Sequence, residues 1–124
     1  MGTIEIEVNI DKKLTTNIAK GEITYKDFLG WAENYYSGAV TEFILWDFTE
    51  ADFSKITSDD LRDLVQVAKK YSYKRAGGKT AFVSNENLSF GLGRMFEMLS
   101  EVEDIQFEYK SFRIMTEAKE WLGV

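Results

Sequence analysis

The sequence contains no cysteine, no histidine and no proline. The lack of cysteine excludes disulfides, thiolate nucleophiles and thiolate metal sites. The lack of histidine removes the commonest general base near neutral pH and the commonest metal ligand. With so few candidates for an active site, we expect a protein that is not an enzyme and that needs no cofactor or metal.

Basic residues are also fewer than acidic ones. The sequence has 15 Lys and Arg and 21 Asp and Glu, which gives a net charge of −6. Binding to a phosphate backbone requires a net-basic face, so this balance disfavours nucleic acid as a partner. No apolar run approaches the roughly 18 residues of a membrane span. The first residues alternate charged and apolar side chains, unlike a signal peptide. We therefore expect a cytoplasmic protein without membrane insertion.

The pattern of apolar residues predicts one α/β domain spanning residues 1–124. Alternation over residues 3–10 and 14–21 predicts an opening hairpin, and the apolar run 41–48 predicts a central strand. Residues 79–84 and 104–112 predict two further strands. Helical stripes follow the capping pairs Thr24–Asp27 and Thr57–Asp60, and further helices are expected after Asn85 or Asn87 and after Thr116. Alternating strands and helices imply a mixed, mostly parallel sheet of about five strands with about four flanking helices.

The stretch SFGLGRM, residues 89–95, carries two glycines after a predicted strand. It does not match a dinucleotide-binding fingerprint, because Phe96 occupies the position of the third glycine, and no Gly-Lys-Ser/Thr follows. Each glycine costs a helix about 0.5–1 kcal/mol relative to alanine. We therefore predict that Gly91 and Gly93 permit close approach of the helix to the sheet or to a second subunit.

The same helix carries more apolar side chains than one core stripe requires. We assign Leu88, Leu92, Met95, Phe96 and Leu99 to the core stripe, and Phe90 and Met98 lie off it. One interpretation is a helix buried on two sides. The other is a ligand or partner surface, adaptable because of its methionines, formed by Phe90, Leu92, Met95, Phe96 and Met98.

Two charged stretches have both a structural and a functional interpretation. Asp47, Glu50 and Asp52 follow the central strand and form either a solvated acidic loop or an oxygen-ligand metal site. The stretch KKYSYKRAGGK, residues 69–79, gathers five cations at a predicted helix end. They either complement the helix dipole or bind a phosphate or lipid headgroup.

Four phrases resemble the SpoIIAA-like group of STAS domains: GEITYKDFLGW, FILWDFTEADFSKITSDDLRDL, GKTAFVSNENLSFGLGRMFEML and FRIMTEAKEWL. The resemblance covers residues 4–122 and implies a bacterial regulatory or protein-interaction module with a central sheet and flanking helices. In anti-sigma-factor antagonists of that superfamily, a partner kinase phosphorylates a serine where a helix begins. The resemblance places such a phospho-switch at Thr57 or Ser58, although the usual glycine is absent and Asp59 and Asp60 follow.

The group is also compared with CRAL-TRIO lipid-transfer domains. That comparison implies an alternative function as a carrier of a lipid or another small apolar ligand, seated by Phe90, Met95, Phe96 and neighbouring rings. The first expectation remains a non-enzymatic module that binds a protein partner or itself as a homodimer through residues 89–99.

Overall fold

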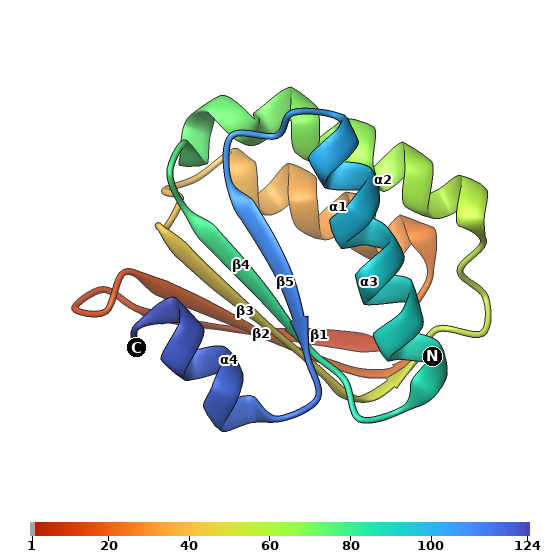
Figure 1. Cartoon of the computed structure of the whole chain (residues 1–124). Coiled ribbons are helices and arrows are strands. Elements are labelled where there is room, and N and C mark those ends of the chain that lie inside the picture. The colour runs from red at the N-terminus through yellow and green to blue at the C-terminus, as the bar shows by residue number, and fades with distance from the viewer. Residues whose placement is uncertain (1) are drawn as a thin grey trace.

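The computed structural model describes residues 2–124 and shows one five-stranded sheet with helices on both faces (Figure 1). The strands lie side by side in chain order, with β1 and β2 antiparallel and the remaining neighbours parallel. The predicted α/β sheet with an N-terminal hairpin is therefore confirmed. The elements are β1 (Thr3–Asn9), β2 (Leu14–Glu22), α1 (Tyr25–Tyr36), β3 (Phe43–Asp52), α2 (Ser58–Tyr71), a 3-10 turn (Ser72–Arg75), β4 (Lys79–Val83), α3 (Asn87–Val102), β5 (Glu108–Phe112) and α4 (Met115–Leu122).

Three helices, α1, α2 and α3, cover one face of the sheet, and α4 alone lies on the other (Figure 1). The core beneath the three helices is rich in aromatic rings, as in the edge-to-face contact of Phe28 and Trp46 at 5.5 Å between ring centroids. The core beneath α4 is smaller and is built around Leu45, Ala81 and Leu122. Of the helices in residues 2–124, none is long and apolar enough to cross a membrane.

Two helices begin at the capping pairs that the sequence predicts. The Thr24 hydroxyl accepts a hydrogen bond from Asp27 N, and the Asp27 carboxylate accepts one from Thr24 N. Thr57 and Asp60 repeat this reciprocal arrangement at the start of α2. Such a box satisfies two backbone N–H groups that the helix itself leaves unpaired.

The beginnings of the other two helices differ from the prediction. Residue Glu86 precedes α3, and no side chain caps this helix, so neither Asn85 nor Asn87 has the predicted role. In α4 the preceding residue is Ile114, and Thr116 lies inside the helix. Gly123 ends α4 in the left-handed conformation as predicted, with φ of 81°.

The strand β1 is more exposed than its alternating pattern suggests. Ile4 packs against the aromatic core, but Ile6 is 45% exposed and Val8 is 60% exposed. Such alternation predicts a strand with one buried face, and this prediction is wrong beyond Ile4. The reason is position, because β1 forms the edge of the sheet and, in the part of the chain that the structure describes, pairs with β2 alone.

Candidate functional site

The two glycines of α3 have different surroundings. A Cβ atom at Gly93 would lie 2.9 Å from Ser111 Oγ and 3.6 Å from the Phe82 ring, so this glycine lets the helix approach β4 and β5. A Cβ atom at Gly91 would meet nothing within 4 Å. Packing within the chain thus accounts for Gly93 and leaves Gly91 without a partner.

The predicted surface residues of α3 divide between the core and the solvent. Leu92 and Phe96 pack against the aromatic core, and the Phe96 ring lies edge-on to Tyr109 at 4.9 Å. Phe90 is partly buried beneath the Arg113 guanidinium, which lies 4.2 Å from its ring centroid. Met95 and Met98 remain 40% and 61% exposed. The five residues therefore do not form one surface.

The core stripe expected on α3 also needs correction. Leu88 and Met95 were assigned to the core, yet both are exposed, and Leu88 is 55% accessible. They share their side of the helix with Gly91, Met98 and Val102, at successive spacings of three and four residues. We call these five residues the α3 seam: Leu88, Gly91, Met95, Met98 and Val102.

The α3 seam has the spacing by which one helix packs along another. Its side chains point away from the sheet, whereas the residues between them, such as Leu92 and Phe96, face the core. Large apolar side chains left in water each forgo roughly 1.5–3 kcal/mol of burial. An apolar stripe with an open glycine near one end is therefore the main candidate binding surface of the chain.

An apolar pocket lies between the sheet and helices α1, α2 and α3. Its volume is about 100 Å³, and its walls include Trp46, Phe48, Phe96 and Tyr109. Sites for drug-sized molecules usually measure roughly 300–1,000 Å³, so this space is smaller than the sites that hold such molecules. Its size does not support the carrier alternative.

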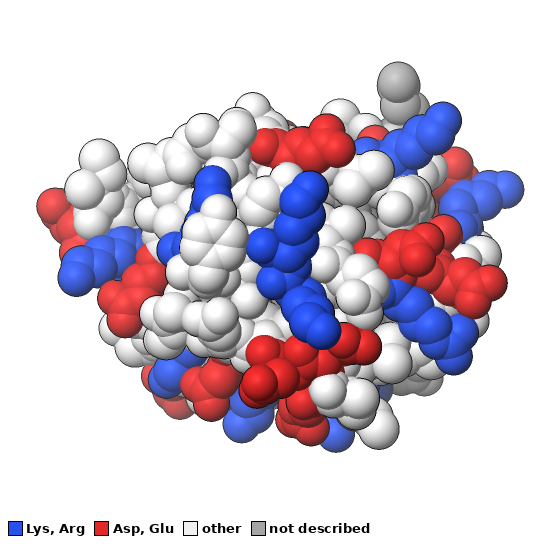
Figure 2. Space-filling view, turned by 90° about the horizontal axis from the view of Figure 1, so that it is seen from above, with Lys and Arg blue, Asp and Glu red and all other residues white. Residues whose placement is uncertain are grey.

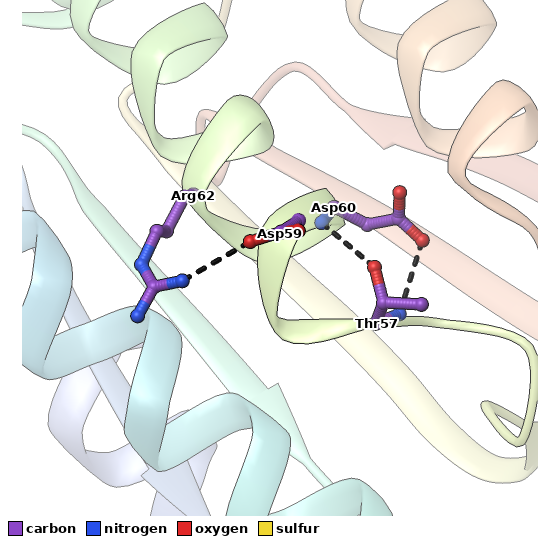
Figure 3. Close-up of polar contacts among 4 residues, drawn as sticks. All are labelled: Thr57, Asp59, Asp60 and Arg62. Carbon is purple, nitrogen blue, oxygen red and sulfur yellow. Dashed lines mark hydrogen bonds and ion pairs between the residues drawn. The ribbon is translucent and has the colours of Figure 1, made fainter.

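Thr57 and Ser58 are both exposed at the N-terminus of α2. Figure 3 shows the contacts of Thr57 with Asp60 and of Asp59 with Arg62. The Thr57 hydroxyl lies 3.0 Å from Asp60 N and serves as the helix cap. Asp59 forms an ion pair with Arg62 at 3.2 Å, on the outer side of the same turn. Ser58 is the first residue of the helix, and no hydrogen bond occupies its hydroxyl among the described residues.

The cations of residues 69–79 are used in separate contacts. Lys69 pairs with Glu103 at 3.2 Å, Lys74 Nζ donates to Tyr36 O, and Lys79 Nζ donates to Trp121 O. On the side shown in Figure 2, basic side chains lie among acidic and uncharged ones. The headgroup interpretation therefore gains no support from a shared basic surface.

Arg75 is the exception within this cluster, because it is only 4% exposed. Its guanidinium lies 4.5 Å from the Phe107 ring centroid and, among the described residues, forms no ion pair. It joins the starts of β3 and β4 by donating to four acceptors: Thr41 O, Glu42 O, Lys79 O and Thr80 Oγ1, at 2.9–3.0 Å. A residue that the sequence suggested as a surface cation is a buried cross-link.

Two tyrosines near Arg75 have raised pKa values. Burial raises the pKa of Tyr109 well above its ordinary value, and burial also raises the pKa of Tyr36. The charge of Arg75 acts in the opposite direction at both rings without cancelling the effect. Both phenols therefore keep their protons near neutral pH.

The acidic residues after the predicted central strand do not form a loop. Asp47, Glu50 and Asp52 lie within β3, which continues to Asp52. The Asp47 carboxylate accepts two hydrogen bonds from Thr49, two residues later in the same strand. The donors are the Thr49 backbone N at 3.0 Å and the Thr49 hydroxyl at 2.7 Å. Within residues 2–124 no three acidic, His or Cys side chains are grouped so that they could hold a metal ion.

Taken together, the sheet order, the hairpin and the three-to-one distribution of helices define a SpoIIAA-like fold. A protein of the DUF3478 family with a SpoIIAA-like fold, from Shewanella loihica PV-4, is 21% identical, with a TM-score of 0.61 over 98% of this chain and 93% of its own. An anti-sigma factor antagonist from Mycobacterium paratuberculosis is 12% identical, with a TM-score of 0.57 over 100% and 96% of the two chains. No protein-family model and no curated protein matches the sequence. The resemblance is thus confirmed for the fold.

Proposed function

We propose that this protein is a non-enzymatic regulatory module that binds a protein partner, or a second copy of itself, through the α3 seam. The observation that carries the proposal is the open Gly91 within a stripe of exposed apolar side chains. A glycine inside a helix destabilises it, so its presence calls for a compensating contact. The shared fold with an anti-sigma factor antagonist supports a role in regulation by protein binding.

The geometry of the seam suits a helix as the bound element. Apolar residues three and four apart accept side chains from an opposing helix, and a glycine permits its backbone to approach closely. Methionines at positions 95 and 98 adapt to the shape of a partner. These features favour a helix–helix contact along the outer side of α3.

The double variant Leu88→Glu/Met98→Glu should abolish self-association while leaving the far-UV circular dichroism unchanged. Both side chains are more than half exposed, so charge is tolerated in the monomer and is costly only when the seam is covered. The measurement is molar mass by multi-angle light scattering over a range of concentrations. Gly91→Ala should weaken the same association, because its methyl group holds an approaching helix away.

A matched control replaces exposed apolar residues elsewhere. Tyr73→Glu/Ile114→Glu changes side chains of 64% and 52% exposure and should not alter the mass. Equal masses for wild type and seam variant would argue against a second copy as the partner. Photo-crosslinking from position 95 in cells then tests whether a different protein binds the α3 seam. Failure to capture any protein would contradict the proposal as a whole.

A phospho-switch at the start of α2 is a second proposal, and it rests on the resemblance. The structure favours Ser58 over Thr57 as the acceptor, because the Thr57 hydroxyl is already engaged by Asp60 N. A phosphate at a helix N-terminus is favoured by the helix dipole. The neighbouring carboxylates Asp59 and Asp60 oppose it.

Two alanine variants separate the cap from the acceptor. Thr57→Ala should lower the free energy of unfolding by about 1 kcal/mol, because it removes the cap, and Ser58→Ala by less than about 0.5 kcal/mol. Urea unfolding measures both values. Phosphopeptide mapping of protein from the source organism should then find the modification on Ser58. Its absence under all growth conditions would contradict the switch.

A further inference from the structure

The strand β1 has a free edge. It pairs with β2 on one side, and no other strand of residues 2–124 pairs with its outer side. Its outward N–H and C=O groups are therefore available along a strand of 7 residues. Such an edge is a template for a strand from another chain.

The two faces of β1 differ in chemistry. Residues directly opposite in an antiparallel pair share a face, so Ile4, Ile6 and Val8 lie on the helix-rich side with Ala19, Asn17 and Thr15. Helix α1 covers this face at β2, where Trp31 Nε1 donates to Asn17 Oδ1 at 3.0 Å. Ile6 and Val8 continue the apolar surface outward from that point and are increasingly exposed.

The opposite face of β1 is acidic. Glu5 lies opposite Ile18, and Glu7 lies opposite Thr16; both carboxylates are exposed. Within the described residues neither glutamate forms an ion pair. Helix α4 makes its main contacts with β3, β4 and β5. Its Met115 and Lys119 line a hollow together with Glu7, and Glu7 remains exposed.

We propose that β1 accepts, as a sixth strand, an extended segment of another protein in which basic and apolar side chains alternate. Side chains of an added strand point alternately to the two faces of the sheet. Those on one face would lie beside Glu5 and Glu7, where Lys or Arg is complementary. Those on the other face would extend the apolar surface of Ile6 and Val8. Main-chain hydrogen bonds supply affinity, and the alternation supplies specificity.

The charge pattern argues against a second copy as the occupant. If two β1 strands paired antiparallel with Ile6 at the centre, Glu5 of each copy would lie opposite Glu7 of the other copy. The pair of strands would then contain two such contacts between like charges. Like charges directly opposite one another destabilise a strand pair. The same carboxylates that disfavour self-pairing favour a basic segment. The edge of β1 is therefore proposed to bind a different kind of partner from the α3 seam.

The test uses three capped peptides of the length of β1. One alternates Lys and Val, one has the same composition in two blocks, and one alternates Glu and Val. The alternating Lys peptide should slow amide exchange in residues 3–9 and bind at least about tenfold more tightly than the others by fluorescence anisotropy. N-methylation of its edge-facing amides should abolish both effects.

The variant Glu5→Lys/Glu7→Lys should reverse the preference in favour of the Glu peptide. Both positions are exposed, so circular dichroism and unfolding should match the wild type. Equal binding by the alternating and block Lys peptides would show that net charge alone, and not the alternation of side chains, determines affinity. That result would overturn the proposal. Protection of β1 in concentrated protein alone would identify a second copy as the occupant and would also overturn it. Failure of every peptide to protect β1 would do the same.

Discussion

Replacing Arg75 with methionine should lower the free energy of unfolding by about 2–4 kcal/mol. The change removes a guanidinium that donates to three carbonyl oxygens and one hydroxyl in a buried position. A buried acceptor left without a donor costs about 1–3 kcal/mol. Methionine fills much of the same volume, so the loss reports hydrogen bonds more than a cavity.

Two effects reduce this loss without reversing it. Removing a buried charge relieves its desolvation cost. Glu42 O also keeps a second donor, because Lys79 N lies 3.0 Å from it. Thr41 O likewise keeps a second donor, the Tyr35 hydroxyl at 3.4 Å. Lys79 O and Thr80 Oγ1 still lose their bonds to the guanidinium, so the net effect is destabilising.

Urea unfolding at neutral pH measures the change, with Arg62→Met as the control. Arg62 is exposed and, among residues 2–124, forms its one ion pair with Asp59 across one helical turn, so its loss should cost less than about 0.5 kcal/mol. Arg75→Lys should lie between the two, because an ammonium cannot reproduce the planar fork of donors. A cost below about 1 kcal/mol for Arg75→Met would show that the cross-link contributes little.

Gly93→Val should lower the free energy of unfolding by about 1–3 kcal/mol. The new Cβ would lie 2.9 Å from Ser111 Oγ and within 4 Å of the Phe82 ring, and the branched methyl groups would add to this crowding. Overpacking of a close-packed region forces side chains and backbone apart. Thermal or urea unfolding measures the loss.

The matched change two residues away should have the opposite sign. Gly91→Ala places a methyl group in open space and improves helix propensity, so the free energy of unfolding should rise by about 0.5–1 kcal/mol. If both variants changed the free energy of unfolding in the same direction, the different surroundings of Gly91 and Gly93 would not explain their roles. Together with the light-scattering result, Gly91→Ala separates stability from partner binding.

Local signals explain what was predictable of the fold. The capping pairs Thr24–Asp27 and Thr57–Asp60 lie within one helical turn, so their chemistry is visible in four residues. Alternation in β1 and β2 gave the hairpin, and regular alternation of strands and helices gave the parallel sheet.

The features that were not predictable depend on long-range neighbours. The burial of Arg75 results from carbonyl groups that lie 33 and 34 residues earlier in the chain. The exposure of Ile6 and Val8 follows from the place of β1 at the sheet edge, which alternation alone cannot reveal. The continuation of β3 through its acidic residues depends on β2, whose Glu22 is aligned with Asp52.

The candidate site was predictable in part. Excess apolar residues in α3 pointed to a binding surface, and the residues Met95 and Met98 do belong to the exposed α3 seam. The core stripe is confirmed for Leu92, Phe96 and Leu99, and Leu92 and Phe96 therefore do not belong to the alternative surface. Helical periodicity identifies a stripe without saying which stripe faces the sheet, and Gly93 marks that side only once Ser111 is known to lie against it.

The order of the strands has a consequence for how the chain is made. Because neighbours in the sheet are also neighbours in sequence, each strand emerging from the ribosome can dock on the one synthesised just before it. No strand has to be inserted between two strands that were synthesised before it. Such assembly adds one strand at a time to the growing edge of the sheet, in the order of synthesis.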